Sequence, residues 1–207
     1  ALASASAVAL DHGAEGARTI TAAGDLAMLK VAAAASPESY AAQIKLGMAL
    51  AAAGDRAAFE PLEMAASLVP MAIVYDSPHA IMGRLAEQLG DTPRAIKEYR
   101  ALLTSDHNDV EVARRLTELA AKANDQTVLA FATDRVVELD PFDASGHTGL
   151  GRIAMRSRDA GVAMREFKVA LAIGPADRAS AHCDLAESYL LAGRPAQRSN
   201  PSPPQKA

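Results

Sequence analysis

An internal period of 34 to 36 residues is the feature of this 207-residue sequence that most constrains its fold. A hydrophobic residue followed by a small one recurs five times, and successive copies lie 36, 34, 34 and 35 residues apart. Periods of this length are typical of proteins built from stacked units, because one unit cannot bury its hydrophobic face alone. The five pairs are Leu46-Gly47, Met82-Gly83, Leu116-Thr117, Leu150-Gly151 and Leu185-Ala186.

A turn signal lies eight residues after each of these hydrophobic residues. Gly or Asn there can adopt the left-handed backbone that ends a helix, and the following Asp or Thr can cap the next helix. Each unit is therefore predicted to be helix, tight turn, helix, and a proline or a polar cluster ends the second helix. The turns are Gly54-Asp55, Gly90-Asp91, Asn124-Asp125, Arg158-Asp159 and Gly193-Arg194, and the closing signals are Pro70, Ser105-Asp106-His107, Pro141 and Pro175.

This pattern resembles the tetratricopeptide repeat (TPR), a family of 34-residue helical hairpins with large and small residues at fixed offsets. Units that start at Tyr40, Asp76, Val110, Ala144 and Ala179 give the match, and the unit 144–178 fits best. The family's aromatic at the fourth position is missing, and Gln43, His79, Ala113, His147 and His182 replace it. The resemblance implies an all-α fold, a right-handed α-solenoid of stacked helix-turn-helix hairpins.

Three segments are predicted along the chain. Residues 1–39 form a degenerate N-terminal helical hairpin or cap, in which helices over 10–23 and 26–35 flank a turn at Gly24-Asp25. Residues 40–198 form the solenoid, and its last unit is incomplete because prolines make a second helix unfavourable there. Residues 199–207 form a disordered Pro-rich tail.

Composition disfavours several classes of protein. The formal net charge of −4 argues against duplex nucleic acid as a partner, which would normally require a basic excess. No apolar run approaches the roughly 18 residues of a spanning helix, so we expect a soluble chain without membrane insertion. The single Cys183 cannot form an internal disulfide, and it leaves open whether the chain is cytoplasmic, periplasmic or secreted.

The sequence contains no motif for catalysis or metal binding. GxSxG, a Walker loop, HExxH and CxxC are all absent. His79, His147 and His182 share one offset in separate repeats, at a position that packs the two helices of a hairpin. Helices pack roughly 8–10 Å apart, so equivalent side chains of separate repeats should rarely share one zinc ion. We expect a non-enzymatic chain without a cofactor or metal site.

The family's geometry implies that the first helices of the hairpins line a concave face, which is the default binding site. Guanidinium groups bind carboxylates bidentately, so an acidic peptide is one candidate ligand for this face. The alternative is that its arginines pair locally with Glu87, Glu111 and Glu118. The candidate groove residues are Arg84, Arg114, Lys122, Arg152, Arg156, Met48 and Met155.

Different functions remain open at this stage. The first is a non-enzymatic module that binds a protein or peptide on the concave face. The alternative is the C-terminal repeat region of a larger bacterial secreted protein, because Asp140–Ala144 and Arg165–Leu190 resemble the repeat tail that follows some zinc-peptidase domains. This chain would then carry no catalytic residues, and its start at Ala1 rather than Met fits such a module. Self-association through the apolar first unit or the truncated last unit is a third possibility.

Overall fold

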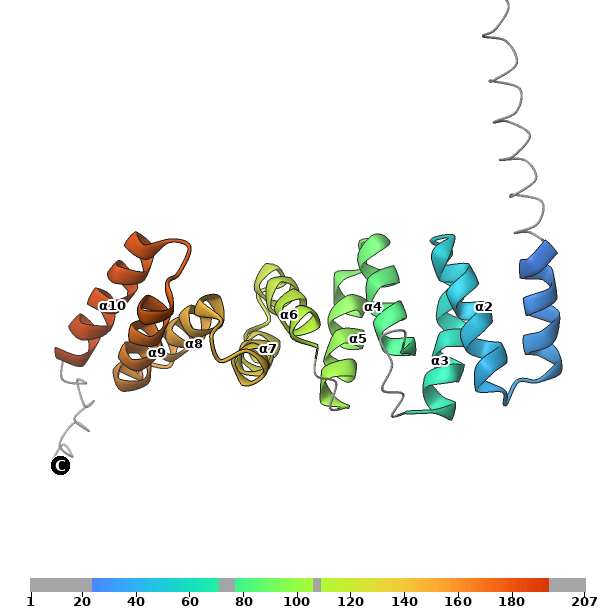
Figure 1. Cartoon of the computed structure of the whole chain (residues 1–207), viewed down its shortest axis with the longest axis horizontal. Coiled ribbons are helices and arrows are strands. Elements are labelled where there is room, and N and C mark those ends of the chain that lie inside the picture. Colours follow the sequence, from blue (N-terminus) through green and yellow to red (C-terminus); the bar gives the residue numbers. More distant parts are fainter. Residues whose placement is uncertain (1–23, 71–76, 106–108, 194–207) are drawn as a thin grey trace, which may run out of the picture. The chain divides into compact units, whose positions relative to one another are not determined.

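The structure is a computed structural model that describes residues 24–70, 77–105 and 109–193 (Figure 1). These ranges contain helices and turns but no β-strand, which confirms the predicted all-α fold. Residues 24–35 are helical. The elements that follow are α2 (Tyr40–Ala52), the 3-10 helix η1 (Arg56–Ala58), α3 (Phe59–Leu68), α4 (Pro78–Gln88), α5 (Thr92–Thr104), α6 (Val110–Lys122), α7 (Gln126–Leu139), α8 (Ala144–Arg156), α9 (Ala160–Ile173) and α10 (Arg178–Gly193).

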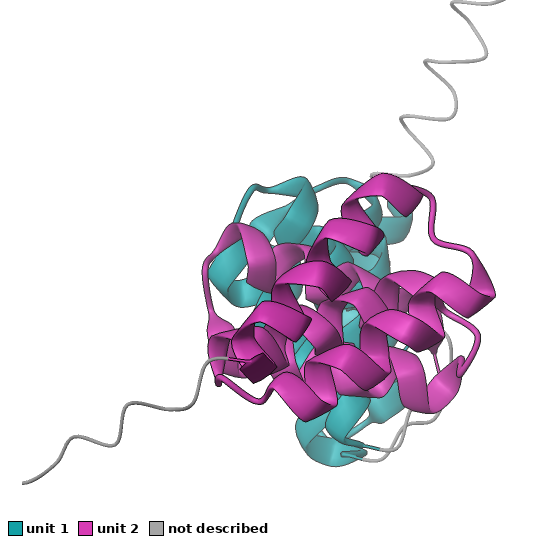
Figure 2. Ribbon diagram, turned by 90° about the vertical axis from the view of Figure 1, so that its left-hand side faces the viewer, with its two compact units in different colours: residues 1–108 teal, residues 109–207 magenta. Residues whose placement is uncertain are grey.

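The chain divides into two compact units, residues 1–108 and residues 109–207 (Figure 2). In the first unit α2 packs against α3, α4 packs against α5, and α3 and α4 join the two hairpins. In the second unit α6 pairs with α7 and α8 with α9, while α7 contacts α8 and α10 packs on α9. Stacked helical hairpins therefore build each unit.

The turn inside each hairpin repeats one backbone conformation. Its left-handed residue is Gly54, Gly90, Asn124 or Arg158, with φ of +68°, +72°, +56° and +59°. In the last of these turns the Asp159 amide donates to the Ala154 carbonyl at 2.9 Å, and the Arg158 amide donates to the Met155 carbonyl at 3.1 Å. This is the Schellman arrangement, which satisfies the free carbonyls at a helix end.

The aspartate after each left-handed residue caps the next helix. Its carboxylate accepts from a backbone amide two or three residues ahead, as Asp159 does from Val162 at 3.0 Å. Asp55, Asp91 and Asp125 do the same for η1, α5 and α7. The second helices α3, α7 and α9 end two residues before Pro70, Pro141 and Pro175, because the residue before proline avoids helical backbone.

One predicted turn is wrong, because Gly24 and Asp25 are helical. A helix tolerates a glycine at a cost of about 1 kcal/mol. The helix α10 ends at Gly193, where the sequence predicts the next turn, and Arg194 lies outside the described residues. The predicted helix over 10–23, the residues Asp106 and His107, and the Pro-rich tail lie outside the described residues.

The cores of the second and fourth hairpins depend on a glycine in the first helix. A Cβ atom on Gly83 would lie 2.4 Å from Tyr99 Cε1, and one on Gly151 would lie 2.4 Å from Phe167 Cε1. The ring of the second helix therefore lies directly on the backbone of the first. Phe167 is fully buried as a result.

Within the part of the chain that the structure describes, no helix combines the length and the apolar composition that a membrane span requires.

Candidate functional site

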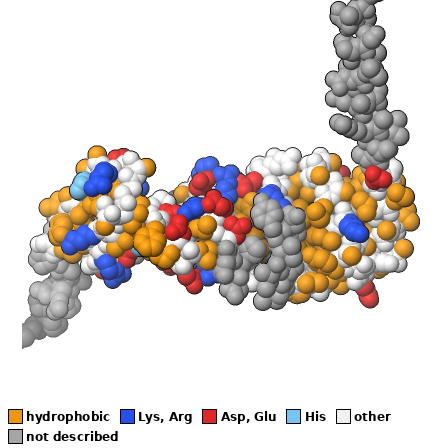
Figure 3. Space-filling model, viewed as in Figure 1, with side chains coloured by type: hydrophobic (Ala, Val, Ile, Leu, Met, Phe, Trp, Pro, Cys, Tyr) orange, Lys and Arg blue, Asp and Glu red, His pale blue; other side chains and the backbone are white. Residues whose placement is uncertain are grey.

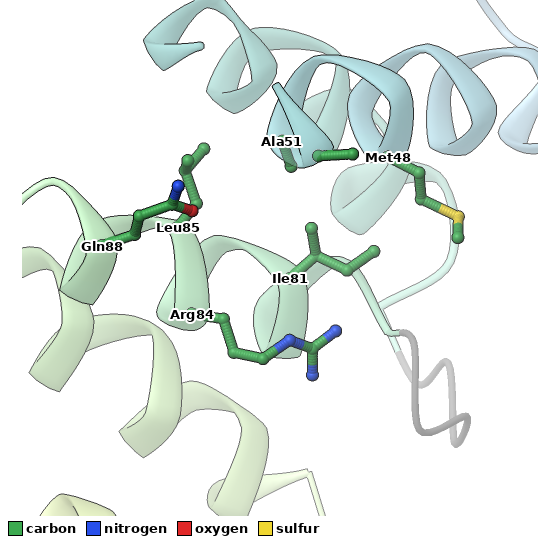
Figure 4. A pocket seen from close by; sticks show the side chains of 7 residues that line it. Met48, Ala51, Ile81, Arg84, Leu85 and Gln88 are labelled. Carbon is green, nitrogen blue, oxygen red and sulfur yellow. The ribbon is translucent and has the colours of Figure 1, made fainter. Parts of the chain in front are cut away.

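The first helices of the two hairpins in the first unit leave a hollow between them. It has a volume of about 340 Å³, and Met48 and Ala51 of α2 lie across it from Ile81 and Arg84 of α4 (Figure 4). Ala52, Leu85 and Gln88 complete the lining. Among these seven residues Arg84 is the one ionisable side chain, so the hollow offers an apolar wall beside a positive charge.

The second unit has two hollows at corresponding places. One of about 410 Å³ lies between α6 and α8, with Thr133 and Val136 of α7 among its lining residues. The other, of about 280 Å³, lies between α8 and α10. First helices contribute to the lining of all three hollows, and the lining includes Met48, Arg84, Arg114 and Arg152 of the candidate groove residues.

No family model matches the sequence. Among solved structures the chain is similar to MamA, with a TM-score of 0.51 and 16% identity over 81% of this chain and 90% of that one. It is also similar to YrrB, described as a TPR protein with an unusual peptide-binding site, with a TM-score of 0.53 and 15% identity over 78% and 82% of the chains. The chain folds as a TPR protein.

A curated protein also matches this chain. Superkiller protein 3 of Schizosaccharomyces pombe is 27% identical to it over 127 residues. The match covers 58% of this chain and 9% of that protein, so the chain spans less than a tenth of the curated relative. The peptidase-tail alternative finds no support in these three matches.

Arg114, a predicted groove residue, binds carboxylates of its own chain. Its Nε donates to Asp143 Oδ2 at 2.7 Å and its Nη2 donates to Asp140 Oδ2 at 2.8 Å. A further hydrogen bond goes to Glu111, a partner that the local-pairing alternative predicted. The two aspartates lie 29 and 26 residues away, so helical spacing does not indicate them. Arg114 therefore connects α6 to the start of α8.

The Asp143 carboxylate is the centre of this connection. Burial raises its pKa, but hydrogen bonds from the Ser145 hydroxyl, the Gly146 amide and Arg114 outweigh burial and hold the pKa below the usual value of aspartate. The hydrogen bond to Asp143 in turn raises the pKa of Arg114. Asp143 also caps α8, so one carboxylate serves both the helix and the contact between hairpins.

The other predicted groove residues of the second unit have different environments. Arg152 donates to Asp184 Oδ2 at 2.8 Å and to Ser180 Oγ at 3.1 Å, and Arg156 donates to Gln126. Lys122 is exposed in the last turn of α6. Met155 is partly buried against the core cluster around Phe167. Of the predicted residues, the structure therefore brings together Met48 and Arg84 in one hollow. Arg114 and Arg152 line two other hollows.

Two histidine–glutamate pairs between the helices of a hairpin, one buried and one partly buried, are a feature that sequence reasoning missed. His147 Nδ1 lies 2.8 Å from Glu166 Oε2, and His79 Nδ1 lies 2.8 Å from Glu98 Oε2. Both histidines pack between the helices of a hairpin, as predicted. His182 at the third equivalent position is exposed, so the prediction of a packed side chain there is wrong.

A signal for these pairs was present in the sequence. Each glutamate follows its histidine by 19 residues, and in the repeat between them Ala113 and Ala132 occupy the same two positions. Both alanines are fully buried. The two positions therefore carry either a histidine with a glutamate or two small residues in these three repeats. Among the described residues no group of three or more His, Cys, Asp or Glu is placed to hold a metal ion.

Proposed function

We propose that this chain is a non-enzymatic interaction module that binds a peptide segment of another protein in the hollow between α2 and α4. The observation that carries the proposal is the composition of this hollow, in which Met48, Ile81 and Leu85 surround an open space beside Arg84. The TPR fold supports an interaction role, and YrrB gives an example of a TPR protein with a peptide-binding site.

The lining of the hollow specifies the ligand chemistry. An apolar side chain of the peptide would contact Met48 and Ile81, removing apolar surface from water at roughly 25 cal/mol per Å². A carboxylate next to it would be attracted to the Arg84 guanidinium. Methionine suits such a site because its flexible thioether adapts to different partners. We therefore propose a peptide with an aliphatic or aromatic residue beside an acidic one.

The test is a selection of peptides from a displayed library against the full chain, followed by affinity measurements with two matched variants. Met48 and Met64 are exposed to a similar extent, 41% and 43%, but Met64 lies on the second helix α3 and lines a different hollow. Met48→Asp should weaken the selected peptides at least about tenfold, because a charge would be buried against an apolar ligand. Met64→Asp should leave their affinity unchanged.

The opposite pattern would contradict the proposal. If Met64→Asp weakens the selected peptides and Met48→Asp does not, binding occurs in the hollow formed by residues 24–35, α2 and α3. The acidic part of the proposal is tested by replacing the peptide's Asp or Glu with its amide. Unchanged affinity after that replacement removes the role of Arg84.

A further inference from the structure

The last described helix, α10, exposes positions that the fourth hairpin buries. Along the 35-residue spacing, His147, Gly151 and Ala154 of α8 correspond to His182, Ala186 and Tyr189 of α10. The three residues of α8 are buried, whereas the three of α10 are exposed, and Tyr189 is 51% exposed. The second helix α9 packs on α8, and no described helix follows α10 to cover it.

A second pair of positions shows that α10 is not more exposed than α8 on every side. Gly146 of α8 and its counterpart Ala181 of α10 are both buried. Gly146 faces the preceding hairpin, since a Cβ atom there would lie 2.8 Å from Val137 Cγ2. The side that faces the preceding hairpin is therefore covered in both helices, whereas the side that a second helix covers in α8 is open in α10.

The complete hairpins show what occupies this side. In the fourth hairpin Glu166 binds His147, and the ring of the next residue, Phe167, lies on Gly151. The second hairpin has the same arrangement, in which Glu98 binds His79 and Tyr99 lies on Gly83. In both hairpins, a histidine on the first helix binds a glutamate of the second helix, and a glycine on the first helix contacts the aromatic residue that follows this glutamate.

The fifth unit has the histidine and the small residue of this arrangement, but not the glutamate and the aromatic residue. It has His182 and Ala186, but the residues 35 positions after Glu166 and Phe167 are Pro201 and Ser202. Tyr189 and Leu190 add apolar surface, with exposures of 51% and 63%. Figure 3 shows hydrophobic side chains on the visible face of the second unit. Lys168 Nζ lies 5.4 Å from the centre of the Tyr189 ring and adds positive charge beside the open side.

We propose that this outer face of α10, made of His182, Ala186, Tyr189 and Leu190, binds an amphipathic helix of a partner protein that carries an acidic residue followed by an aromatic one. The partner's carboxylate accepts a hydrogen bond from His182, and its ring packs on Ala186. The partner helix then takes the place of a second helix in the fifth hairpin. This surface lies in the second unit, so it does not depend on the hollow between α2 and α4.

A synthetic peptide with the sequence of residues 159–173, which contains Glu166 and Phe167, is the probe for this surface. Its fluorescein conjugate is titrated with the full chain and followed by fluorescence anisotropy. The wild-type chain should bind it, and Ala186→Lys should weaken binding at least about tenfold because a charge replaces a central contact. The matched control is Ala121→Lys, at an exposed alanine of α6 in the same unit, which should not change the affinity.

The specificity of the pair is tested with His182→Ala and with a peptide in which alanine replaces both Glu166 and Phe167. Each change should weaken binding, and circular dichroism should show unchanged helicity of the protein variants. The proposal is overturned if the wild-type chain fails to bind the peptide at about 1 mM, or if Ala186→Lys binds as well as wild type. It is also overturned if light scattering shows a wild-type dimer that Ala186→Lys dissociates, because a second copy would then occupy the face.

Discussion

At the scale of single residues, the distance between the two helices of a hairpin is limited by the glycine of the first helix. At Gly151 the ring of Phe167 occupies the space where a Cβ atom would lie. The sequence predicted this close approach, because the large-small pair recurs at every unit. It did not predict Glu166 beside the ring, because a glutamate at this position ordinarily indicates a solvent-exposed face.

Gly151→Ala should destabilise the second unit, although alanine is the better helix former. The new methyl group would overlap the Phe167 ring, and overpacking of this kind costs about 1–3 kcal/mol in the free energy of unfolding. Gly161→Ala is the matched control, because its Cβ atom would meet nothing closer than 3.5 Å, and it should be neutral or stabilising by up to about 1 kcal/mol. Urea unfolding followed by circular dichroism measures both, and equal stability of the two variants would contradict the packing.

The His147–Glu166 pair should behave as a coupled unit in a double-mutant cycle. Glu166→Ala leaves a buried imidazole without its carboxylate partner, and a lost partner of this kind costs about 1–3 kcal/mol in the free energy of unfolding. The double variant His147→Ala, Glu166→Ala reproduces the Ala113 and Ala132 pair of the third hairpin. Its loss of stability should be smaller than the sum of the single losses by about 0.5–3 kcal/mol. Strict additivity would show that the two side chains do not interact.

At the scale of helices and turns, the local signals are predictable and the contacts between hairpins are not. The units predicted to start at Tyr40, Val110 and Ala144 begin with a helix at those residues, because each cap depends on residues within one turn of the helix. The helices α4 and α10 start instead at Pro78 and Arg178, within two residues of the predicted unit starts. Arg114 reaches Asp140 at the end of α7 and Asp143 at the start of α8, and side-chain partners this far apart leave no periodic trace in one sequence. The arginine predicted for a ligand is therefore a structural contact.

Acid should weaken the contact between α6 and α8. The folded-state pKa of Asp143 is lowered, so its contribution is fully present above the unfolded pKa near about 4 and is lost as pH falls through the folded pKa. Urea unfolding at pH 7, 5, 4 and 3 should show this loss in the wild type and a smaller one in Asp143→Asn. At pH 7 that variant should lose roughly 1–3 kcal/mol, mainly from the Arg114 contact, because asparagine still caps a helix.

Asp134→Asn is the control with the opposite sign. Partial desolvation of this exposed side chain, and then the charges of Glu138 and Glu166, raise the pKa of Asp134, so its ionised form opposes folding at neutral pH. Replacing it with asparagine should raise the free energy of unfolding near pH 7. If Asp134→Asn loses as much stability as Asp143→Asn, the charges of these two aspartates do not determine the change in the free energy of unfolding.

At the scale of the whole molecule, the repeat period predicted the architecture because the two helices of each hairpin pack on one another through equivalent positions. The structure confirms the all-α fold and the hairpins within each unit, and it leaves the predicted boundaries at residues 40 and 198 as predictions. The candidate site could be predicted only as a set of positions. Whether a predicted arginine remains available depends on carboxylates of neighbouring hairpins, and a single sequence does not indicate which of these come close.

The most direct test of the proposed binding hollow is a methyl NMR titration of the full chain labelled at its seven methionines. A peptide selected against the chain is added, and each methyl signal is assigned by a Met→Leu variant. We expect the Met48 signal to move on addition of the peptide while those of Met64 and Met28 stay in place, since Met48 is the one of these three that lines the hollow between α2 and α4. A moving Met64 signal with an unchanged Met48 signal would contradict binding in this hollow.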